Sequence, residues 1–243
     1  MISGADPYFS LSREIYHPDE RLLANVIEPL FRGVPLRGRS MLDVGGGSGL
    51  MSFYAASHGA APVVCLEPSE AGSNPQMDET FRRWQDGLGE NAPVDLVRSR
   101  FQDLEPSERF EIVLINSAIN HLDEEACARL PHDPEARVAY VDIFETLAEL
   151  TAPGGDLIIA DAARKNMWGA LGVRSPFART IEWKIHAQPS VWAELAEESG
   201  FSNPSVTWRA HARLGGVGRV VFGNALGGWL TNSMFVLHLR RGG

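Results

Sequence analysis

The residues with the clearest chemical potential are three glycines that follow a short apolar run. The run 41–44 contains Asp43 and leads into Gly45, Gly47 and Gly49. Glycine has no side chain, so a loop of this kind lets the backbone approach a bound ligand closely. The spacing is G-x-G-x-G and not the G-x-G-x-x-G of dinucleotide-binding loops, which argues against NAD and FAD. The loop suits a ligand with a charged tail and a sugar but no pyrophosphate.

A second candidate for ligand binding is an acidic residue that also follows an apolar run. Glu67 follows the apolar run 63–66, roughly 20 residues after the glycine loop, where α/β folds place the acid that binds a ribose. We therefore predict that the Glu67 carboxylate accepts hydrogen bonds from both ribose hydroxyls. The alternative is an ordinary surface glutamate after a strand.

These residues need a scaffold that brings the ends of several strands together. Apolar runs predict strands at 40–44, 63–67, 94–97, 110–115, 156–160, 201–208 and 234–239. Runs with helical periodicity lie between them, at 19–31, 50–58, 135–150 and 189–199. Because ligands of parallel sheets bind outside the carboxyl ends of the strands, we expect the glycine loop and Glu67 at one edge of an α/β sheet.

Taken together, the glycine loop, Glu67 and the turn 152–155 before the fifth strand resemble the class I S-adenosylmethionine (SAM) dependent methyltransferases. The resemblance covers about residues 38–161 and, more loosely, 189–240. It implies a Rossmann-like, seven-stranded, mostly parallel sheet with helices on both faces, and a seventh strand that runs antiparallel between strands 5 and 6. It also implies SAM as the cofactor. We expect residues 1–243 to form a single methyltransferase domain.

The resemblance implies roles for further residues at the strand ends. Asp103, after the third strand, is expected to accept a hydrogen bond from the adenine amino group, with Phe101 and Gln102 as neighbours; the alternative is an aspartate that caps a turn. Asn116, after the fourth strand, is expected to bind the methionine end of SAM. The glycine loop, with Gly45, Gly47 and Gly49, is expected to hold the methionine part of SAM, and Asp43 just before it is expected to bind the cofactor with it.

The N-terminal residues 1–35 are expected to be helical, and the resemblance offers two interpretations of them. They are either a lid over the acceptor, with Tyr8 and Tyr16 as the residues that contact it, or helices that cover the edge of the sheet.

Methyl transfer needs a base only when the accepting atom arrives protonated. His121 follows the fourth strand, where the resemblance places the acceptor, and is our first candidate for a general base. His186 is the second candidate, and Asp161, at the end of the fifth strand, is a candidate acceptor ligand. Structural roles are the alternatives: a helix-start histidine, a solvated helix face and a strand-end cap.

Composition excludes several classes of protein. The formal net charge of −9 disfavours nucleic acid as a partner, since such proteins usually present a basic face. The two cysteines form no C-x-x-C pair, which argues against a zinc site and excludes a disulfide framework. Neither a signal peptide nor an apolar run long enough to cross a membrane is recognisable, so no membrane association and a cytoplasmic location are expected.

Two specialised branches of the resembling family do not fit. Metal-assisted catechol methylation would need a carboxylate after the fourth strand and an Asp-Asn pair after the fifth, where this chain has Asn116 and Asp161-Ala162; we expect no metal. Methylation of nucleic-acid bases would need Asn-Pro-Pro-Tyr or a similar sequence at Asn116. The residues there are Asn-Ser-Ala-Ile.

The sequence thus predicts methyl transfer from SAM to an oxygen or nitrogen of a small molecule. A SAM-binding subunit or scaffold without catalysis is the main alternative, and an aminopropyl transferase is a third hypothesis that the residues after the fourth strand disfavour. The glycine-rich segment 209–232 could pack against a second copy of the chain in a homo-oligomer.

Overall fold

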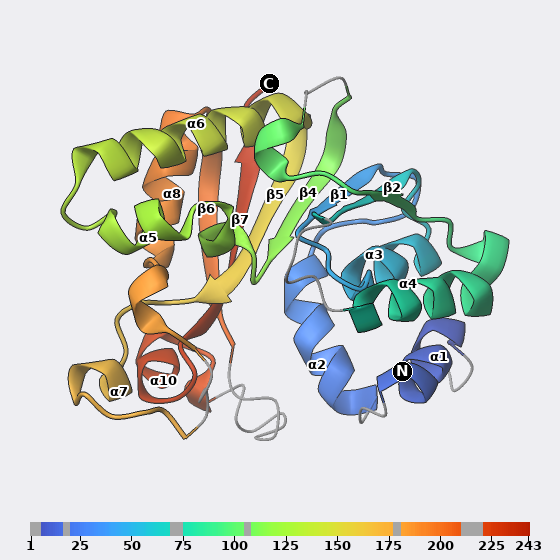
Figure 1. Ribbon diagram of the computed structural model, residues 1–243, viewed down its shortest axis with the longest axis horizontal. Helices are drawn as coiled ribbons and strands as arrows, with labels where there is room; N and C mark the ends of the chain where they lie inside the picture. Colours follow the sequence, from blue (N-terminus) through green and yellow to red (C-terminus); the bar gives the residue numbers. More distant parts are fainter. Residues whose placement is uncertain (1–5, 17–19, 69–74, 105–107, 177–180, 210–220) are drawn as a thin grey trace.

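The protein is described from a computed structural model, which places all residues except 1–5, 17–19, 69–74, 105–107, 177–180 and 210–220. A seven-stranded sheet in the order β3-β2-β1-β4-β5-β7-β6 runs through its centre (Figure 1). The strands are β1 (Met41–Val44), β2 (Val63–Leu66), β3 (Asp95–Val97), β4 (Phe110–Asn116), β5 (Thr151–Ala162), β6 (Phe201–Trp208) and β7 (Met234–Arg241).

The directions of the strands confirm the expected topology. β3, β2, β1, β4 and β5 pair in parallel, and β7 lies antiparallel between β5 and β6. In Figure 1 the arrow of β7 accordingly points the opposite way from that of β5. The carboxyl ends of β1 to β5 therefore meet at one edge of the sheet, and the loops that follow them are neighbours.

Helices cover both faces of the sheet, as expected (Figure 1). One face carries α1 (Pro7–Tyr16), α2 (Glu20–Phe31), α3 (Leu50–Ser57) and α4 (Pro75–Leu88), and the other carries α5 (Glu124–Arg129), α6 (Pro134–Leu150) and α8 (Pro189–Glu198). Two short helices, α7 (Met167–Ala170) and α10 (Ala225–Leu230), lie side by side near the carboxyl edge, where Trp168 Nε1 donates to the Leu230 carbonyl at 3.1 Å. Single 3-10 turns are η1 (Gly89–Asn91), η2 (Phe101–Asp103), η3 (Ile119–Leu122) and η4 (Trp183–Ile185).

The sequence periodicity explains these elements. The four residues 112–115 of β4 are all fully buried, because a central parallel strand is covered on both faces and so needs a continuous apolar run. In α6 the buried Tyr140, Phe144 and Leu147 recur at helical spacing and form one apolar face against the sheet.

One expected turn lies inside a strand. Residues 152–155 were expected to precede the fifth strand, but β5 already begins at Thr151, and its register against β4 shifts between Phe110 and Ile112. Gly154 has a φ of 72°, a conformation that glycine adopts without strain, so the chain bends there without leaving the sheet. The expectation of a turn was wrong in its boundary because this bend is accommodated as a bulge.

None of the helices among the placed residues is both long enough and apolar enough to cross a bilayer. Of the glycine-rich segment 209–232, residues 210–220 lie outside the described part of the chain, and α10 occupies much of the remainder.

Candidate functional site

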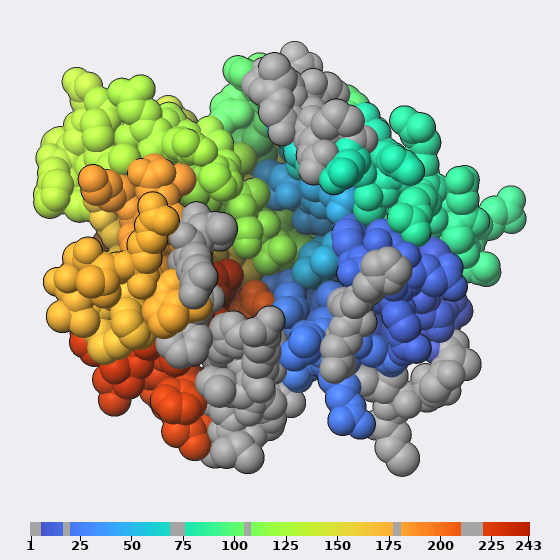
Figure 2. All heavy atoms as spheres, turned by 60° about the horizontal axis from the view of Figure 1, so that its bottom comes forward, coloured from blue at the N-terminus to red at the C-terminus, as the bar shows by residue number. Residues whose placement is uncertain are grey.

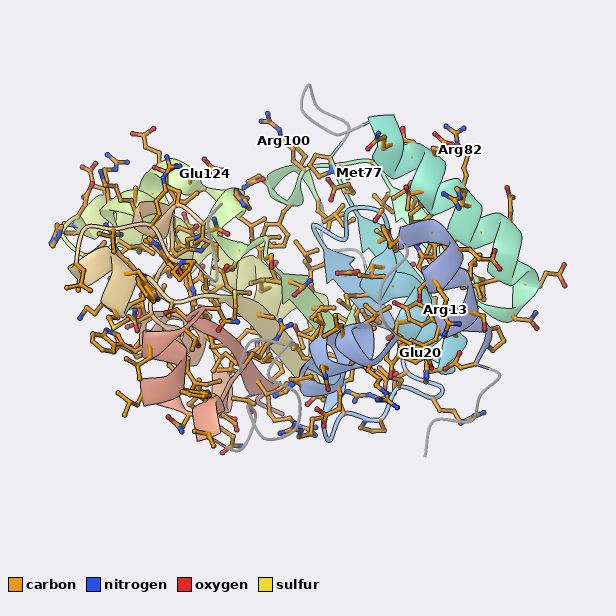
Figure 3. All side chains as sticks on the ribbon, turned by 90° about the horizontal axis from the view of Figure 1, so that it is seen from below. Arg13, Glu20, Met77, Arg82, Arg100 and Glu124 are labelled. Atoms are coloured by element: carbon orange, nitrogen blue, oxygen red, sulfur yellow. The ribbon has the colours of Figure 1, made fainter. Side chains whose placement is uncertain are left out.

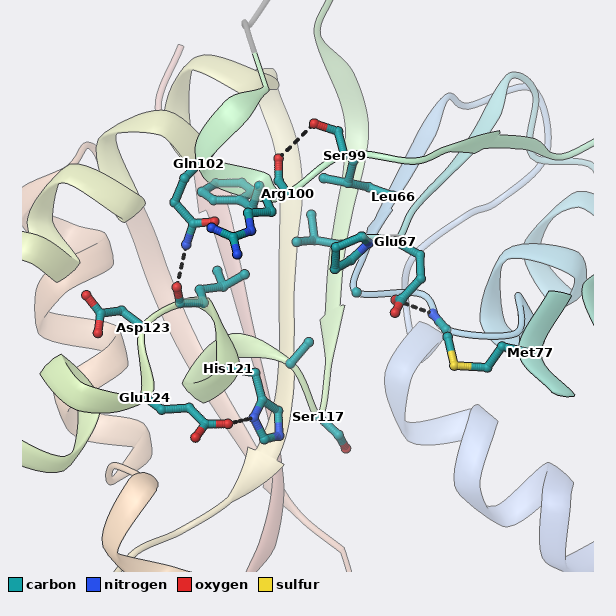
Figure 4. Close-up of a pocket in the computed structure, with 17 residues that line it drawn as sticks. Leu66, Glu67, Met77, Ser99, Arg100, Gln102, Ser117, His121, Asp123 and Glu124 are labelled. Carbon is teal, nitrogen blue, oxygen red and sulfur yellow. Dashed lines mark hydrogen bonds and ion pairs between the residues drawn. The ribbon is translucent and has the colours of Figure 1, made fainter. Parts of the chain in front are cut away.

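A cavity of about 630 Å³ opens at the carboxyl ends of β1, β2, β3 and β4. Figure 2 shows the surface hollowed at this edge, between the blue N-terminal helices and the yellow-green residues that follow β4. Pockets for small molecules and cofactors usually measure about 300–1,000 Å³. Its walls, drawn in Figure 4, are Val44, Gly45, Gly47, Leu66, Glu67, Pro68, Met77, Ser99, Arg100, Phe101, Gln102, Ser117, Ala118, His121, Leu122, Asp123 and Glu124.

The glycine loop is shaped by close packing as well as by its position at the cavity. Gly45 has a φ of 69°, and a Cβ there would lie 2.5 Å from the Cβ of Ala118, in the loop after β4. Gly49 caps α3 with a φ of 82°, and a Cβ there would meet the ring of Phe53 at 2.8 Å. Gly45 and Gly47 line the cavity, whereas Gly49 does not. Position 49 therefore needs a glycine because of its backbone conformation and its packing against Phe53.

Glu67 contacts the glycine loop at the wall of the cavity. Its Oε2 accepts a hydrogen bond from the Gly47 N–H at 2.9 Å, and the side chain is half-buried (Figure 4). A carboxylate bound by one backbone N–H keeps further lone pairs for other donors. The arrangement therefore leaves Glu67 able to bind a pair of hydroxyl groups, as its position in the sequence predicts.

Asp43 lies beneath the loop and does not line the cavity. It is 1% exposed, and its Oδ2 accepts a hydrogen bond from Ser52 Oγ at 2.7 Å. Burial raises the pKa of Asp43 to about 6; the charge of Glu67 adds to this rise, and the hydrogen bond from Ser52 opposes it. Asp43 therefore joins β1 to α3 and supports the loop from below.

The residues after β3 are divided between the cavity and the solvent. Phe101 and Gln102 line the cavity, and Gln102 Nε2 donates to the Leu122 carbonyl. Asp103, the expected partner of the adenine amino group, is exposed and is not among the lining residues. The carboxylate that does line this part of the cavity is Asp123, whose Oδ1 accepts from the Ala126 N–H at 2.8 Å as the cap of α5.

The end of β4 presents Ser117 to the cavity. Asn116 is half-buried, pairs with Ala160 of β5 and does not line the cavity. Ser117 is exposed, lines the cavity and has a φ of 58°, which is uncommon for a residue other than glycine. Its N–H donates to the Ala160 carbonyl at 2.7 Å, which fixes the turn against β5.

His121 lines the cavity from η3 and is paired with an acid. Its Nδ1 lies 2.5 Å from Glu124 Oε1, and its Nε2 lies 3.5 Å from the Nδ2 of Asn120. Figure 4 shows the contact between His121 and Glu124. Both side chains are about half exposed. The buried Tyr140 of α6 donates its hydroxyl to the carbonyls of Ile119 and Asp123, at 3.1 Å each, and so holds the turn that carries His121.

The two N-terminal tyrosines have different surroundings. Tyr8 is fully buried, stacks on Trp84 at 5.0 Å and donates its hydroxyl to the Leu50 carbonyl at 3.0 Å. It is therefore a core residue of α1, where the sequence predicted an acceptor contact. Tyr16 is 40% exposed, and its hydroxyl lies 2.5 Å from Oγ of Ser48 in the glycine loop.

Helix α1 is fixed to the helices around it. Arg13 forms an ion pair of 2.8 Å with Glu20 of α2, and Figure 3 labels the two residues close together at the N-terminal helices. Arg83 of α4 donates to the Glu14 carbonyl at 3.1 Å. The end of α1 therefore borders the glycine loop in a defined position.

Asp161 and His186, which the sequence offered as separate candidates, form a pair. Nδ1 of His186 lies 3.2 Å from Oδ2 of Asp161, and both side chains are buried. Neither residue lines the cavity.

Several lining residues had no sequence prediction. Three of them, Ser117, Asp123 and Glu124, follow β4 closely. They could have been predicted, because ligands bind at the residues that follow the carboxyl ends of parallel strands. Arg100 and Met77 carry no sequence signal of a role. Within the placed part of the chain, no group of three or more His, Cys, Asp or Glu side chains gathers in a way that could hold a metal ion.

The comparisons with known proteins agree on one family. Residues 16–206 match a family model described as a methyltransferase domain. A ubiquinone biosynthesis O-methyltransferase of Rhizobium rhizogenes is 32% identical over 141 residues, which are 57% of this chain and 47% of that protein. A protein with the same description from Paramagnetospirillum magneticum is 28% identical over 186 residues, covering 72% of this chain and 68% of that protein. The match thus spans less than half of the first relative.

A solved structure shares the fold. The crystal structure of an S-adenosylmethionine-dependent methyltransferase from Mesorhizobium loti superposes with a TM-score of 0.56 and 17% identity, covering 98% of this chain and 99% of that one.

Proposed function

This chain belongs to the class I SAM-dependent methyltransferases, and we propose that it transfers the methyl group of SAM to a hydroxyl oxygen of a small molecule. The observation that carries the proposal is the cavity in which Glu67 and the glycine loop face one another at the carboxyl edge. The oxygen acceptor is favoured over a nitrogen acceptor because both relatives described above are O-methyltransferases.

We propose one orientation for SAM in this cavity. Glu67 would bind the ribose hydroxyls, and the residues 99–102 would surround the adenine. The amino-acid tail would then lie toward the glycine loop and the start of α3, where backbone N–H groups favour a carboxylate. Asp43 would act indirectly by supporting the loop, and the roles of Asp103 and Asn116 as cofactor contacts remain predictions.

The N-terminal helix would close the tail end of this site. Tyr16 reaches Ser48 of the glycine loop, so in this orientation α1 would lie closer to the cofactor than to the acceptor. We therefore propose that residues 1–35 cover the cofactor within a single domain of residues 1–243.

Bound SAM supplies a methyl group on a good leaving group, so the protein's main tasks are to hold the acceptor in line and to exclude water. His121 would remove the proton from the attacking hydroxyl. Glu124 accepts from Nδ1 of His121, which leaves Nε2 as the basic nitrogen and stabilises the imidazolium that forms.

Two measurements test this function. Calorimetry with S-adenosylhomocysteine should show binding at one site, and transfer of labelled methyl from SAM should be found within a panel of phenols, sugars and amines, with the hydroxyl compounds preferred. Binding without transfer would favour the non-catalytic scaffold, and preference for amines would overturn the oxygen acceptor.

The role of the base needs a separate test. His121→Ala should lower kcat at neutral pH and leave the affinity for S-adenosylhomocysteine unchanged. His132→Ala is the matched control, since His132 is exposed and lies outside the cavity. Equal turnover of the two variants would eliminate His121 as the base.

A further inference from the structure

A second pair of an imidazole and a carboxylate lies beside the cofactor cavity. Asp161 is the penultimate residue of β5, and each of its carboxylate oxygens lies 3.2 Å from Nδ1 of His186, just after η4. The side chains of Asp161 and His186 are 2% and 10% exposed, against 56% and 54% for Glu124 and His121. The protein therefore encloses this pair, whereas the pair at the cavity is open to solvent.

The order of the strands places the pair on the acceptor side. From β3 to β5 the carboxyl edge carries the residues around the adenine, then Glu67, the glycine loop, and Ser117 with His121. Ser117 donates to the carbonyl of Ala160, so Asp161 lies one residue and one strand beyond the cavity wall. Neighbouring strands are about 4.8 Å apart. An aromatic acceptor bound next to Ser117 would therefore extend as far as the end of β5.

The surroundings fix the histidine in place. Cys127 of α5 donates through Sγ to the carbonyl of Ile185 at 3.0 Å, which ties the preceding residue to a helix. Ala187 on the other side is buried, and α8 begins two residues later at Pro189. A side chain held on both sides and by a buried carboxylate has the preorganisation that a recognition residue needs.

The chemistry of the pair is directional. Because Asp161 accepts a hydrogen bond from Nδ1, the proton of a neutral His186 lies on Nδ1, and Nε2 carries a lone pair. Within the described ranges, no residue makes a hydrogen bond to Nε2. An acceptor atom in this state is suited to a donor from a ligand, and the nearby carboxylate disfavours an anionic ligand.

We infer that His186, oriented by Asp161 as a positioning residue, binds a second hydroxyl group of the methyl acceptor, remote from the oxygen that is methylated. The acceptor class is then a small neutral compound with two hydroxyl groups, as on an aromatic ring. The inference rests on the proposed function, in which His121 serves the reacting oxygen. A pair that only fastened β5 to the residues before α8 would make no such distinction between acceptors.

The test compares acceptors with one and with two hydroxyl groups. In the wild type, kcat/KM should be at least a hundredfold higher for resorcinol or catechol than for phenol, because a site built to bind a hydroxyl strongly rejects the analogue that lacks it. His186→Asn keeps an amide donor for Asp161 but removes Nε2, so it should lower this ratio at least tenfold. His132→Asn should leave the ratio unchanged, and all three proteins should bind S-adenosylhomocysteine equally. An equal ratio in the wild type and His186→Asn would overturn the inference.

A measurement without turnover completes the test. With S-adenosylhomocysteine saturating and histidine labelled with ¹⁵N, resorcinol should shift the Nε2 signal of His186, identified by its loss in His186→Asn. Asp161→Asn should change that shift, because its amide can donate to Nδ1 and move the ring proton to Nε2, which would then donate to a hydroxyl instead of accepting from it. An unchanged signal overturns the inference even if methyl transfer to phenol is observed, whereas failure to bind S-adenosylhomocysteine at all would overturn the proposed function.

Discussion

The buried carboxyl group of Asp43 should make the stability of the protein depend on pH in a defined direction. Its pKa is about 6 in the folded protein and about 3.9 in an unfolded chain. Below pH 4 the group is protonated in both states, and the stability of the protein does not change with pH on its account. Between about pH 4 and pH 6 the unfolded chain has lost this proton while the folded protein still holds it, so the free energy of unfolding falls as pH rises. Above pH 6 the folded protein carries the buried charge and the loss is complete.

The size of this effect follows from the same values. A pKa of about 6 instead of 3.9 corresponds to about 3 kcal/mol, at about 1.36 kcal/mol for each unit by which the pKa is shifted. Asp43→Asn stays neutral at every pH, and its side-chain oxygen can still accept the hydrogen bond from Ser52. The free energy of unfolding of Asp43→Asn, relative to the wild type, should therefore rise by about 3 kcal/mol between pH 4 and pH 7.

The assay is urea unfolding at half-unit steps of pH from 4 to 7.5. Asp142→Asn is the control, since Asp142 is exposed on α6, and its difference from the wild type should be flat. The reasoning would be refuted if the difference between Asp43→Asn and the wild type were equally flat, or if it fell with pH.

Three further results are expected. Glu67→Ala should weaken the binding of S-adenosylhomocysteine more than tenfold in calorimetry while the exposed Glu145→Ala does not, and equal affinities would remove Glu67 from the ribose site. Tyr16→Phe should weaken S-adenosylhomocysteine severalfold but not methylthioadenosine, which lacks the amino-acid tail; an equal loss for both would place Tyr16 elsewhere. Gly45→Ala should lower the melting temperature, since its Cβ would meet Ala118 at a strained φ, and Ala118→Gly should restore part of the loss; no restoration would argue against that contact.

The fold was predictable because its signals are local. Each strand is a short apolar run, and the buried run 112–115 shows why a central parallel strand cannot be mistaken for a surface one. The position of Glu67 was predictable from the apolar run before it, since a residue directly after a parallel strand lies at the carboxyl edge of the sheet. The antiparallel β7 came from the family resemblance and not from the run itself.

The side-chain arrangements were less predictable because they depend on packing between distant segments. Tyr8 is aromatic and near the N-terminus, which fits a lid, but its stacking on Trp84 is decided by how α1 docks on α4. Asp161 and His186 are 25 residues apart, and only the packing of α5, η4 and β5 brings them together. The exposure of Asp103 was not predictable, because the single turn η2 is too short for the periodicity to indicate which of its residues face solvent.

The fit between Gly45 and Ala118 sets a limit on how this enzyme can diversify. The glycine loop and the loop after β4 touch at these two residues, and there is no space for a Cβ at position 45. If the glycine loop holds the cofactor, as proposed, a change of either residue would alter the cofactor site as well as the acceptor site. New acceptor specificity should therefore arise further along the sheet, beyond β5, where side chains can be exchanged without changing the contact between these two loops.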